Sequence, residues 1–527
     1  MAVALALICA AVAGCGGSRG STSKTTPLPA LQPGRVGPES MFTIASQLTD
    51  NPTATLNQLK QLGVDRVHIS LPWGSIAPDP QSHTRPAFDA TDPAAYPAAG
   101  WAVYDKIVRG LAARHIGIDL ALTGPPPVWA EATGGPKYDY NENDYKPDPA
   151  AYQLWVQAVG KRYSGTYTPP GQSTPLPRIN FWSIWNEPNL GTFLAPETAH
   201  GGATVEIAPQ LYRGLVDGAW KALHATGHGD DTILIGELAP IGNPGVGVFN
   251  VMAPLRFLRA LYCVDANLRQ LRGTAATARG CPATAGGSAT FAADNPGLFH
   301  ASGFADHPYP YGLPPDKASP GGPDDTDLAQ IPNLESLLDR VNRIYGSSTR
   351  FPIWSTEFGY ETNPPNVITV PMKTAALYLN WAEYLTWSDP RIKSYDQYLL
   401  DDPPAANGFT TGLNFYSGKP KPIYAAYRMP LYLPVSSTAK GHPVVVWGEV
   451  RPAPDAAAQT HRPQSVQIQF RSGASGAFKT VQRVKLTNAH GYFEVHQTFG
   501  STGQVRLRWV SPGGQASFSR VAPVTLH

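Results

Sequence analysis

Eight short apolar runs follow one another between residues 42 and 400, and segments with helical patterns separate most of them. The runs cover residues 42–46, 65–73, 116–124, 178–186, 232–239, 303–309, 350–358 and 392–400. The helical patterns cover residues 54–63, 104–115, 150–163, 208–227, 334–346 and 372–385. Strands that are apolar along their whole length are typical of parallel sheets covered by helices. Repeated βα units of this number predict an α/β fold, a (β/α)8 TIM barrel over residues 41–430.

An open, doubly wound sheet is the alternative arrangement for such a pattern. Sheets of that kind usually carry a glycine-rich phosphate turn after an early strand. The sequence has no such turn after its first apolar runs. The closed barrel is therefore favoured.

After about residue 440 the pattern changes to alternating apolar and polar residues. The alternating runs cover residues 444–450, 465–472, 479–487, 492–499, 505–511 and 518–526, and turn-forming residues separate several of them. This alternation predicts a small antiparallel β-sandwich of immunoglobulin-like proportions over residues 440–527. A chain of 527 residues is long enough for two such folded units.

The N-terminus has the features of a processing signal. Residues 2–14 form an apolar run that is too short to span a bilayer comfortably. Its last residues and Cys15 read VAGC, which is similar to a bacterial lipobox whose cysteine receives lipid. We expect a lipoprotein-type signal over 1–15, a flexible Gly/Ser/Thr/Pro tether over 16–40, and an exported bacterial protein, either a cell-surface lipoprotein or secreted. A plain secretion signal and a structural helix are the alternatives.

Cysteine usage agrees with export. The chain has 4 Cys, of which Cys9 and Cys15 lie in the predicted signal. Cys263 and Cys281 share one loop-like segment, and two cysteines so placed in an exported protein predict a disulfide. A metal site would need more ligands than that segment offers.

Charge and motifs exclude several other functions. The formal net charge is +2 and no block of Lys and Arg is present, which argues against a nucleic-acid-binding surface. Neither an H-E-x-x-H pattern, nor a Cys/His cluster, nor a Walker loop occurs. We therefore expect no cofactor and no metal, and a monomer that contacts a membrane only through an N-terminal lipid.

Two glutamates follow apolar runs at positions where a barrel would carry its chemistry. Glu187 follows the fourth run and Glu357 the seventh, and functional residues of (β/α)8 barrels cluster at the C-terminal ends of the strands. Paired carboxyl groups on either side of an acetal are the apparatus of glycoside hydrolysis. Burial raises the pKa of one carboxyl while hydrogen-bond donors keep the other ionised. A surface Glu at a loop and a structural salt bridge are the alternatives.

The segments IWNEPN and IWSTEFG around these glutamates resemble the two catalytic strand ends of clan A retaining glycoside hydrolases, the 4/7 superfamily. The order of motifs is similar to families 5 and 39 and their cellulase-like bacterial relatives. The resemblance spans residue 41 to about residue 430 and includes GVDRVHISLPWGSIAP, DHPYPYG and YLLDDP.

The resemblance implies roles for five residues. Glu187 would be the acid/base and Glu357 the nucleophile of a double-displacement hydrolysis of a β-linked poly- or oligosaccharide. Asn186 would bind the sugar 2-hydroxyl. His307 and Tyr309 would lie near the nucleophile, with Tyr309 tuning its charge. Asn186 could equally form a turn before Pro188, and a histidine next to a proline is often structural.

The second run departs from the clan pattern. Clan members usually place an Arg, which supports the nucleophile, where this chain has His68. Arg66 shares the same face of a regular strand but lies two positions earlier. Either His68 substitutes as donor, or the electrostatics of the site differ, or His68 is a hydrogen-bonded core histidine. The departure also motivates an alternative function, a non-catalytic surface carbohydrate-binding protein on a degenerate barrel.

Three further residues are candidates for contact with a carbohydrate. Trp73 could stack on a sugar face, although most Trp side chains in a barrel serve packing. Glu237 ends the fifth run and could reach the cleft. Tyr398 closes the eighth run and could line a subsite.

Overall fold

The computed structural model describes residues 30–44, 46–133, 144–199, 205–243, 247, 250–367, 369–404 and 409–527. The predicted signal, Cys15 and most of the predicted tether lie outside the described residues. The chain forms two compact units. One comprises Gly37–Tyr360 and Leu385–Leu399, and the other comprises Met1–Val36, Glu361–Tyr384 and Leu400–His527.

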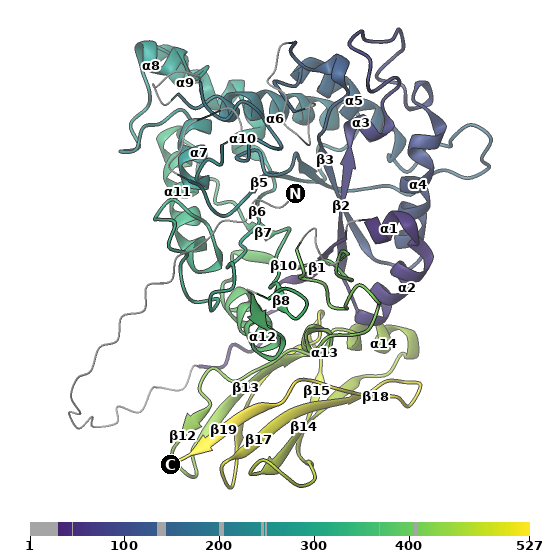
Figure 1. Cartoon of the computed structure of the whole chain (residues 1–527), viewed down its shortest axis with the longest axis vertical. Coiled ribbons are helices and arrows are strands. Elements are labelled where there is room, and N and C mark those ends of the chain that lie inside the picture. The colour runs from purple at the N-terminus through teal and green to yellow at the C-terminus, as the bar shows by residue number, and fades with distance from the viewer. Residues whose placement is uncertain are drawn as a thin grey trace. The chain divides into compact units, whose positions relative to one another are not determined.

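The first unit contains a closed parallel barrel, so the predicted fold class is confirmed (Figure 1). Its strands run in the order β1-β10-β7-β6-β5-β4-β3-β2. They are β1 (Glu39–Thr43), β2 (Arg66–Pro72), β3 (Gly117–Thr123), β4 (Phe181–Ile184), β5 (Thr232–Leu238), β6 (Gly303–Asp306), β7 (Ile353–Ser355) and β10 (Ile392–Tyr398). Each predicted apolar run overlaps one of these strands.

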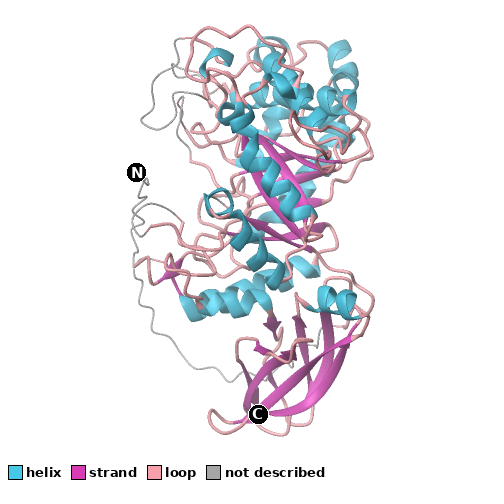
Figure 2. Ribbon diagram, turned by 90° about the vertical axis from the view of Figure 1, so that its right-hand side faces the viewer, coloured by secondary structure: helices cyan, strands magenta, loops and turns pink. Residues whose placement is uncertain are grey.

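Helices surround the barrel strands (Figure 2). Those of the predicted pattern are α2 (Pro52–Leu62), α4 (Ala98–Ala112), α5 (Pro149–Arg162), α6 (Ala208–Ala225) and α11 (Ile331–Ile344). The predicted helix α12 (Met372–Ser388) also forms, and its residues up to Tyr384 belong to the other unit. Shorter ones are α1 (Ser46–Asp50), α3 (Trp73–Ile76), α7 (Pro254–Leu261), α8 (Gly273–Thr277), α9 (Ala285–Asp294) and α10 (Pro296–His300). In the part of the chain that the structure describes, no helix has both the length and the apolar character needed to cross a membrane.

Helix α6 shows how a helix positions the strands that carry the site. Its buried residues recur at helical spacing, as in Tyr212, Leu215 and Ala219, which gives one apolar face. The Tyr212 hydroxyl donates to the Ile184 carbonyl oxygen at 3.1 Å and accepts from the Gly236 N–H at 2.7 Å. This one side chain therefore ties the end of β4 to β5.

The barrel interior changes from apolar to polar along its axis. Phe181, the first residue of β4, forms a buried cluster with Leu234 and Ala305, and Trp354 packs against it. Residues two positions further along a strand lie on the same face. Ser183 follows Phe181 by this spacing and is fully buried, so a polar layer lies above the apolar one.

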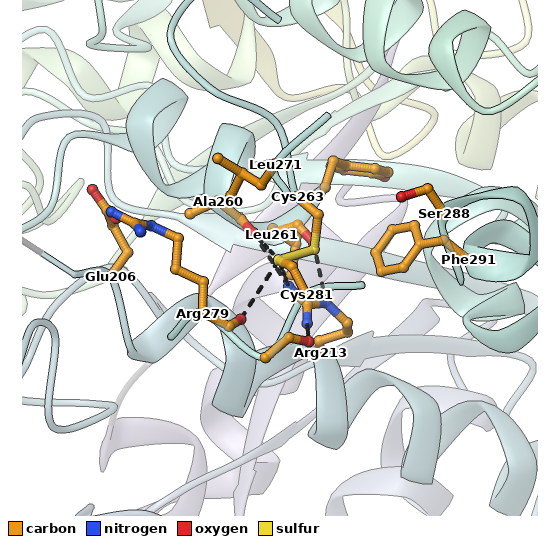
Figure 3. Close-up of a disulfide and its surroundings, with 12 residues drawn as sticks. Glu206, Arg213, Ala260, Leu261, Cys263, Leu271, Arg279, Cys281, Ser288 and Phe291 are labelled. Carbon is orange, nitrogen blue, oxygen red and sulfur yellow. Dashed lines mark hydrogen bonds and ion pairs between the residues drawn. A yellow bond between two sulfur atoms is a disulfide. The ribbon is translucent and has the colours of Figure 1, made fainter. Parts of the chain in front are cut away.

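The predicted disulfide between Cys263 and Cys281 is confirmed, with Cα atoms 5.6 Å apart (Figure 3). The Arg213 side chain of α6 lies against it (Figure 3). Arg213 donates to the carbonyl oxygens of Leu261 at 3.1 Å and Gly280 at 2.9 Å. The cross-linked loop is thus anchored to α6 through backbone carbonyls.

The second unit contains two sheets. One has the order β11-β13-β16, and the other has the order β12-β19-β17-β14-β15 with β18 paired to β17. The strands are β11 (Leu431–Tyr432), β12 (Ser437–Thr438), β13 (Pro443–Glu449), β14 (Gln464–Ser472), β15 (Lys479–Leu486), β16 (Tyr492–Thr498), β17 (Gly503–Val510), β18 (Ala516–Phe518) and β19 (Ala522–Leu526). This unit also contains the short pair β8 (Thr362–Asn363) and β9 (Val370–Pro371), and the helices α13 (Pro422–Arg428) and α14 (Ala453–Thr460).

The two sheets share one apolar core, to which Val446, Ile468 and Leu507 contribute fully buried side chains. Most strand pairs are antiparallel, as predicted, whereas the short β12 pairs with β19 in parallel.

The last predicted strand of the sandwich, 518–526, is wrong, because the structure divides it into β18 and β19. Between the two, the Ser519 hydroxyl accepts from the Leu507 N–H at 2.8 Å. A side chain that accepts a hydrogen bond from a backbone N–H of the neighbouring strand competes with the backbone pairing of the sheet and interrupts it.

Residues at the end of the predicted tether hydrogen bond to the sandwich. The Gln32 N–H donates to the Glu494 carboxylate at 2.7 Å. The Asn488 side-chain amide donates to the carbonyl oxygens of Arg35 at 2.8 Å and Val36 at 2.9 Å. These contacts precede the start of β1 at Glu39.

Candidate active site

Glu187 lies three residues after the end of β4, on a backbone with left-handed geometry. Trp185 has φ 70° and Glu187 has φ 40°, values that non-glycine residues rarely adopt. The Glu187 N–H donates to the Glu237 carbonyl oxygen at 2.8 Å, which holds this turn against the end of β5. Backbone of this kind costs about 1–3 kcal/mol per residue and is concentrated at functional sites.

Glu237 enters the barrel interior through a bulge in β5. The pairing of β5 with β6 shifts between Gly236 and Leu238, so Glu237 is the extra residue. Its φ of 51° is again left-handed. Bulges re-aim side chains next to active sites, and the Glu237 side chain is fully buried.

His307, directly after β6, lies between the two glutamates. Its Nδ1 is 2.9 Å from Glu187 Oε1, and its Nε2 is 2.9 Å from Glu237 Oε2. The Thr356 hydroxyl also donates to Glu237 Oε2, at 2.8 Å. Burial disfavours the charged ring, but the carboxylates of Glu357, Glu187 and Glu237 raise the pKa of His307 well above its usual value. An imidazolium can donate from both nitrogens, as this geometry requires.

Glu357 follows β7 and lies next to the same histidine. Its Oε2 accepts from the Tyr309 hydroxyl at 3.0 Å and is 3.7 Å from His307 Nδ1. The carboxylate oxygens of Glu187 and Glu357 lie within 4.8 Å of each other. Burial raises the pKa of the Glu357 carboxyl, while His307 and Tyr309 act against the rise.

A deeper layer of polar side chains lies below these groups. His68 is fully buried on β2, with Nδ1 2.8 Å from Asp119 Oδ2 on β3. The Ser183 hydroxyl of β4 donates to the same carboxylate oxygen at 3.1 Å. Arg66 does not reach this layer, because it pairs with Glu39 at 2.8 Å and lies over the Phe181 ring.

A cavity of about 350 Å³ opens beside Glu357, which is within the range of small-molecule sites. Glu357 and Tyr398 line it at one end, and the ends of β1 and β2 contribute hydroxyl and apolar side chains, among them Thr43 and Ser70. The Tyr398 ring also packs edge-on against Tyr309. Tyr398 therefore lies in the wall of the cavity, and its contact with a sugar stays a prediction.

Two predicted contact residues differ in their surroundings. Asn186 is partly buried next to Glu187 at the end of β4. Trp73 is fully buried, and its ring stacks on Trp155 at 5.6 Å between centroids. Trp73 is therefore a packing residue in this structure, because no face of its ring is open to a ligand.

Several polar residues of the site were not predicted. They are Asp119, Ser183, Thr356, Thr43 and Asp396. Asp396 of β10 accepts from the Phe358 N–H at 3.2 Å and from the Thr43 hydroxyl at 3.1 Å. Asp119 and Asp396 are single carboxylates inside apolar runs of the sequence. A buried carboxylate in such a run is costly unless it is paired. The presence of an acidic residue inside an apolar run could therefore have identified both aspartates as members of a polar site.

Among the residues that the structure describes, two groups of side chains have the composition of metal ligands. In each, the ligand-type atoms lie within 4.8 Å of one another; the groups are His68 with Asp119 and Glu237, and His307 with Glu187 and Glu357. Both ring nitrogens of His307 face carboxylate oxygens at hydrogen-bond distance, so neither is left for a metal. Nδ1 of His68 is likewise engaged by Asp119. We interpret the His307 group as a hydrogen-bonded charge cluster. In the His68 group, Nε2 of His68, Asp119 Oδ1 and Glu237 Oε1 have no hydrogen-bond partner among the described residues.

The sequence matches no protein-family model, and it matches none of the curated proteins compared with it. Solved structures with a similar fold include a family 39 glycoside hydrolase from Bacteroides cellulosilyticus WH2, at 14% identity and TM-score 0.46 over 89% of this chain and 81% of that one. A glucosidase from Croceicoccus marinus aligns at 12% identity and TM-score 0.45, over 89% of this chain and 87% of that one. An endo-β-1,4-mannanase from Thermotoga petrophila aligns at 11% identity and TM-score 0.38, over 94% and 98%. Any function must therefore be argued from the site itself.

Proposed function

We propose that the chain is a retaining glycoside hydrolase that cleaves O-glycosidic bonds of a β-linked poly- or oligosaccharide. The observation that carries the proposal is the pair Glu187 and Glu357, which place one carboxylate oxygen each within 4.8 Å of the other. Glu357 also lines the cavity. In retaining enzymes the two carboxyl groups are about 5–5.5 Å apart, whereas inverting enzymes need about 6.5–9.5 Å to admit a water molecule. The short separation supports retention.

One contact of Glu357 supports the role of nucleophile for this residue. The Tyr309 hydroxyl donates to Glu357, and a donor of this kind stabilises a carboxylate, the form that a nucleophile needs. Glu357 would attack the anomeric carbon while Glu187 gives its proton to the departing oxygen. Glu187 would then take a proton from water, and the resulting hydroxide would displace Glu357 from the sugar.

Hydrolysis assays with a matched variant test this proposal. Aryl β-glycosides and several plant and microbial polysaccharides would be incubated with the wild type and with Glu357→Gln. We expect hydrolysis that depends on Glu357 and, by NMR of the first product, an anomer of the same configuration as the substrate. First release of the opposite anomer would mean inversion. Binding of polysaccharide without Glu357-dependent hydrolysis would favour the carbohydrate-binding alternative.

We propose in addition that the protein is exported and lipid-anchored through Cys15. The disulfide between Cys263 and Cys281 supports an oxidising compartment. The apolar run before VAGC supports lipid attachment. In a bacterial host, the wild type is expected in the membrane fraction with a lipid-labelled N-terminus, and Cys15→Ser without label. Equal labelling of both would contradict the anchor.

A further inference from the structure

His68 is a buried titratable group that the double-displacement cycle does not use. Its side chain is fully buried, and Nδ1 is 2.8 Å from Asp119 Oδ2. Its Nε2 has no hydrogen-bond partner among the described residues, and neither has Asp119 Oδ1 or Glu237 Oε1. A neutral imidazole in this place would leave several buried carboxylates with little compensating charge, which is costly in a protein interior.

Carboxylates surround His68 on several barrel strands. One carboxylate oxygen each of Asp119 and Glu237 and one ring nitrogen of His68 lie within 4.8 Å of one another. The permanent cation on the same strand, Arg66, is 2.8 Å from Glu39 and is engaged there. The charged groups that act on His68 from the surrounding elements are Asp119 of β3, Glu237 of β5, Glu357 after β7 and Asp396 of β10.

We propose that His68 is a positioning residue that is held as an imidazolium, and that its charge keeps Glu237 and Glu357 ionised beneath the cavity. The proposal rests on the proposed function, in which Glu357 must be a carboxylate to attack. His68 acts through its neighbours and does not touch the substrate. Glu237 in turn holds His307, and His307 contacts both Glu187 and Glu357. The positive charge in the barrel is thus shared between two histidines.

The electrostatics of the cluster agree with this arrangement. Burial disfavours the charged ring, but Asp119 and Glu237 raise the pKa of His68 to about 9. Although burial acts in the opposite direction, His68 and His307 lower the pKa of the Glu237 carboxyl below its usual value. His68 also opposes the rise that burial imposes on the pKa of Glu357. Loss of the His68 proton to solvent would therefore favour protonation of Glu357, the inactive form of a nucleophile.

Two NMR titrations test the charge of His68 without any need for activity. The NMR signals of the histidine ring nitrogens would be followed from pH 6 to pH 10 in ¹⁵N-histidine-labelled protein. The signals of His68 are assigned as those that disappear in His68→Gln. We expect the imidazolium signal at pH 7 and titration near pH 9. In Asp119→Asn, which removes one facing carboxylate, the titration should move to lower pH. A neutral His68 ring at pH 7 in the wild type would overturn the proposal, whether or not the protein is a glycosidase.

The effect on Glu357 is measured in the same way. With ¹³C-labelled glutamate, and with Glu357 assigned by Glu357→Gln, the carboxyl titration should move up by at least one pH unit in His68→Gln. In His68→Lys, which restores a cation, it should return toward the wild-type value. An unchanged Glu357 titration in folded His68→Gln would overturn the proposal.

Kinetics then link the charge to catalysis. The acidic limb of the kcat/KM profile should shift with the Glu357 titration, by at least one pH unit upward in His68→Gln and back in His68→Lys. A loss of packing alone would lower activity equally at all pH values. If no substrate is hydrolysed but the NMR titrations come out as expected, the proposed function is contradicted. The charge of His68 is then still established.

Discussion

Each of the two units buries a cluster of charged side chains, and the two clusters differ in kind. In the barrel, His68 and His307 lie among the carboxylates of Asp119, Glu237 and Glu357. In the other unit, Arg451 lies 2.6 Å from Glu383 and 2.5 Å from Glu449. The Tyr492 hydroxyl also donates to Glu383, at 3.0 Å, and the Tyr427 ring lies 4.1 Å from the Arg451 guanidinium carbon.

The comparison separates a cluster of fixed charge from a cluster whose cations can titrate. The cation of the second cluster is an arginine, which does not lose its proton in proteins, and its members are completely or almost completely buried. The cations of the barrel cluster are histidines, whose charge depends on pH. The outer carboxylates of that cluster, Glu187 and Glu357, each keep 15% of the side chain exposed. A buried charge pair alone is weak evidence of function, whereas titratable cations with partly open carboxylates mark a site.

Replacement of Glu357 should produce the largest loss of activity. It tests whether the barrel cluster serves catalysis. For Glu357→Gln we expect kcat/KM to fall roughly 10⁴-fold or more, because the amide cannot form the covalent intermediate. Thermal unfolding should show no loss of stability, since the change removes a buried charge. Assays on aryl glycosides together with calorimetry test both statements. A loss of less than tenfold would exclude Glu357 as nucleophile.

Replacement of Glu187 should have a smaller effect that depends on the substrate. General acid catalysis contributes roughly 10²–10⁴-fold, so Glu187→Gln should lose that much on substrates with poor leaving groups. With a dinitrophenyl leaving group, which departs without a proton, the first step should be nearly unaffected. A panel of leaving groups measures the slope of rate against leaving-group pKa. An equal loss across the panel would mean that Glu187 is not the acid.

Replacement of Arg451 tests whether the cluster in the second unit contributes to stability and not to activity. Arg451→Met leaves Glu383 and Glu449 buried without their cation, which should lower the free energy of unfolding by about 3–5 kcal/mol. Activity per folded molecule is expected to stay within about twofold, because the cluster supplies no group to the site. Urea unfolding measures the loss. The matched control also carries Glu383→Gln and Glu449→Gln, and it should recover most of the stability; if it does not, lost packing of Arg451 is the cause.

The two clusters also show what a sequence can reveal. The barrel strands were predictable because each corresponds to an apolar run of a few consecutive residues in the sequence. The positions of Glu187 and Glu357 were predictable because both lie at the ends of such runs. The bulge at Glu237 was not, since it depends on how β5 pairs with β6. The Arg451 cluster was not predictable either, because Arg451 and Glu383 are 68 residues apart and only the fold brings them together. Local patterns thus place Glu187 and Glu357, whereas tertiary pairing brings Glu237 and Arg451 to their partners.

The pH dependence of the free energy of unfolding should also distinguish the two clusters. This is the smallest of the expected effects. The pKa of His68 is raised in the folded protein from its ordinary 6.5 to about 9. A raised pKa contributes stability that is fully present below about pH 6.5 and is lost as the pH rises through about 9. Relative to His68→Gln, the wild type should therefore lose at most about 3 kcal/mol of its free energy of unfolding across that window. Urea unfolding at half-unit pH steps measures this difference. The combined variant Arg451→Met, Glu383→Gln and Glu449→Gln should show no comparable slope relative to the wild type, because an arginine stays charged throughout and the two amides leave no buried carboxylate without its cation. A difference between wild type and His68→Gln that is flat from pH 6 to pH 9.5 would mean that both clusters hold fixed charge, and the distinction between them would fail.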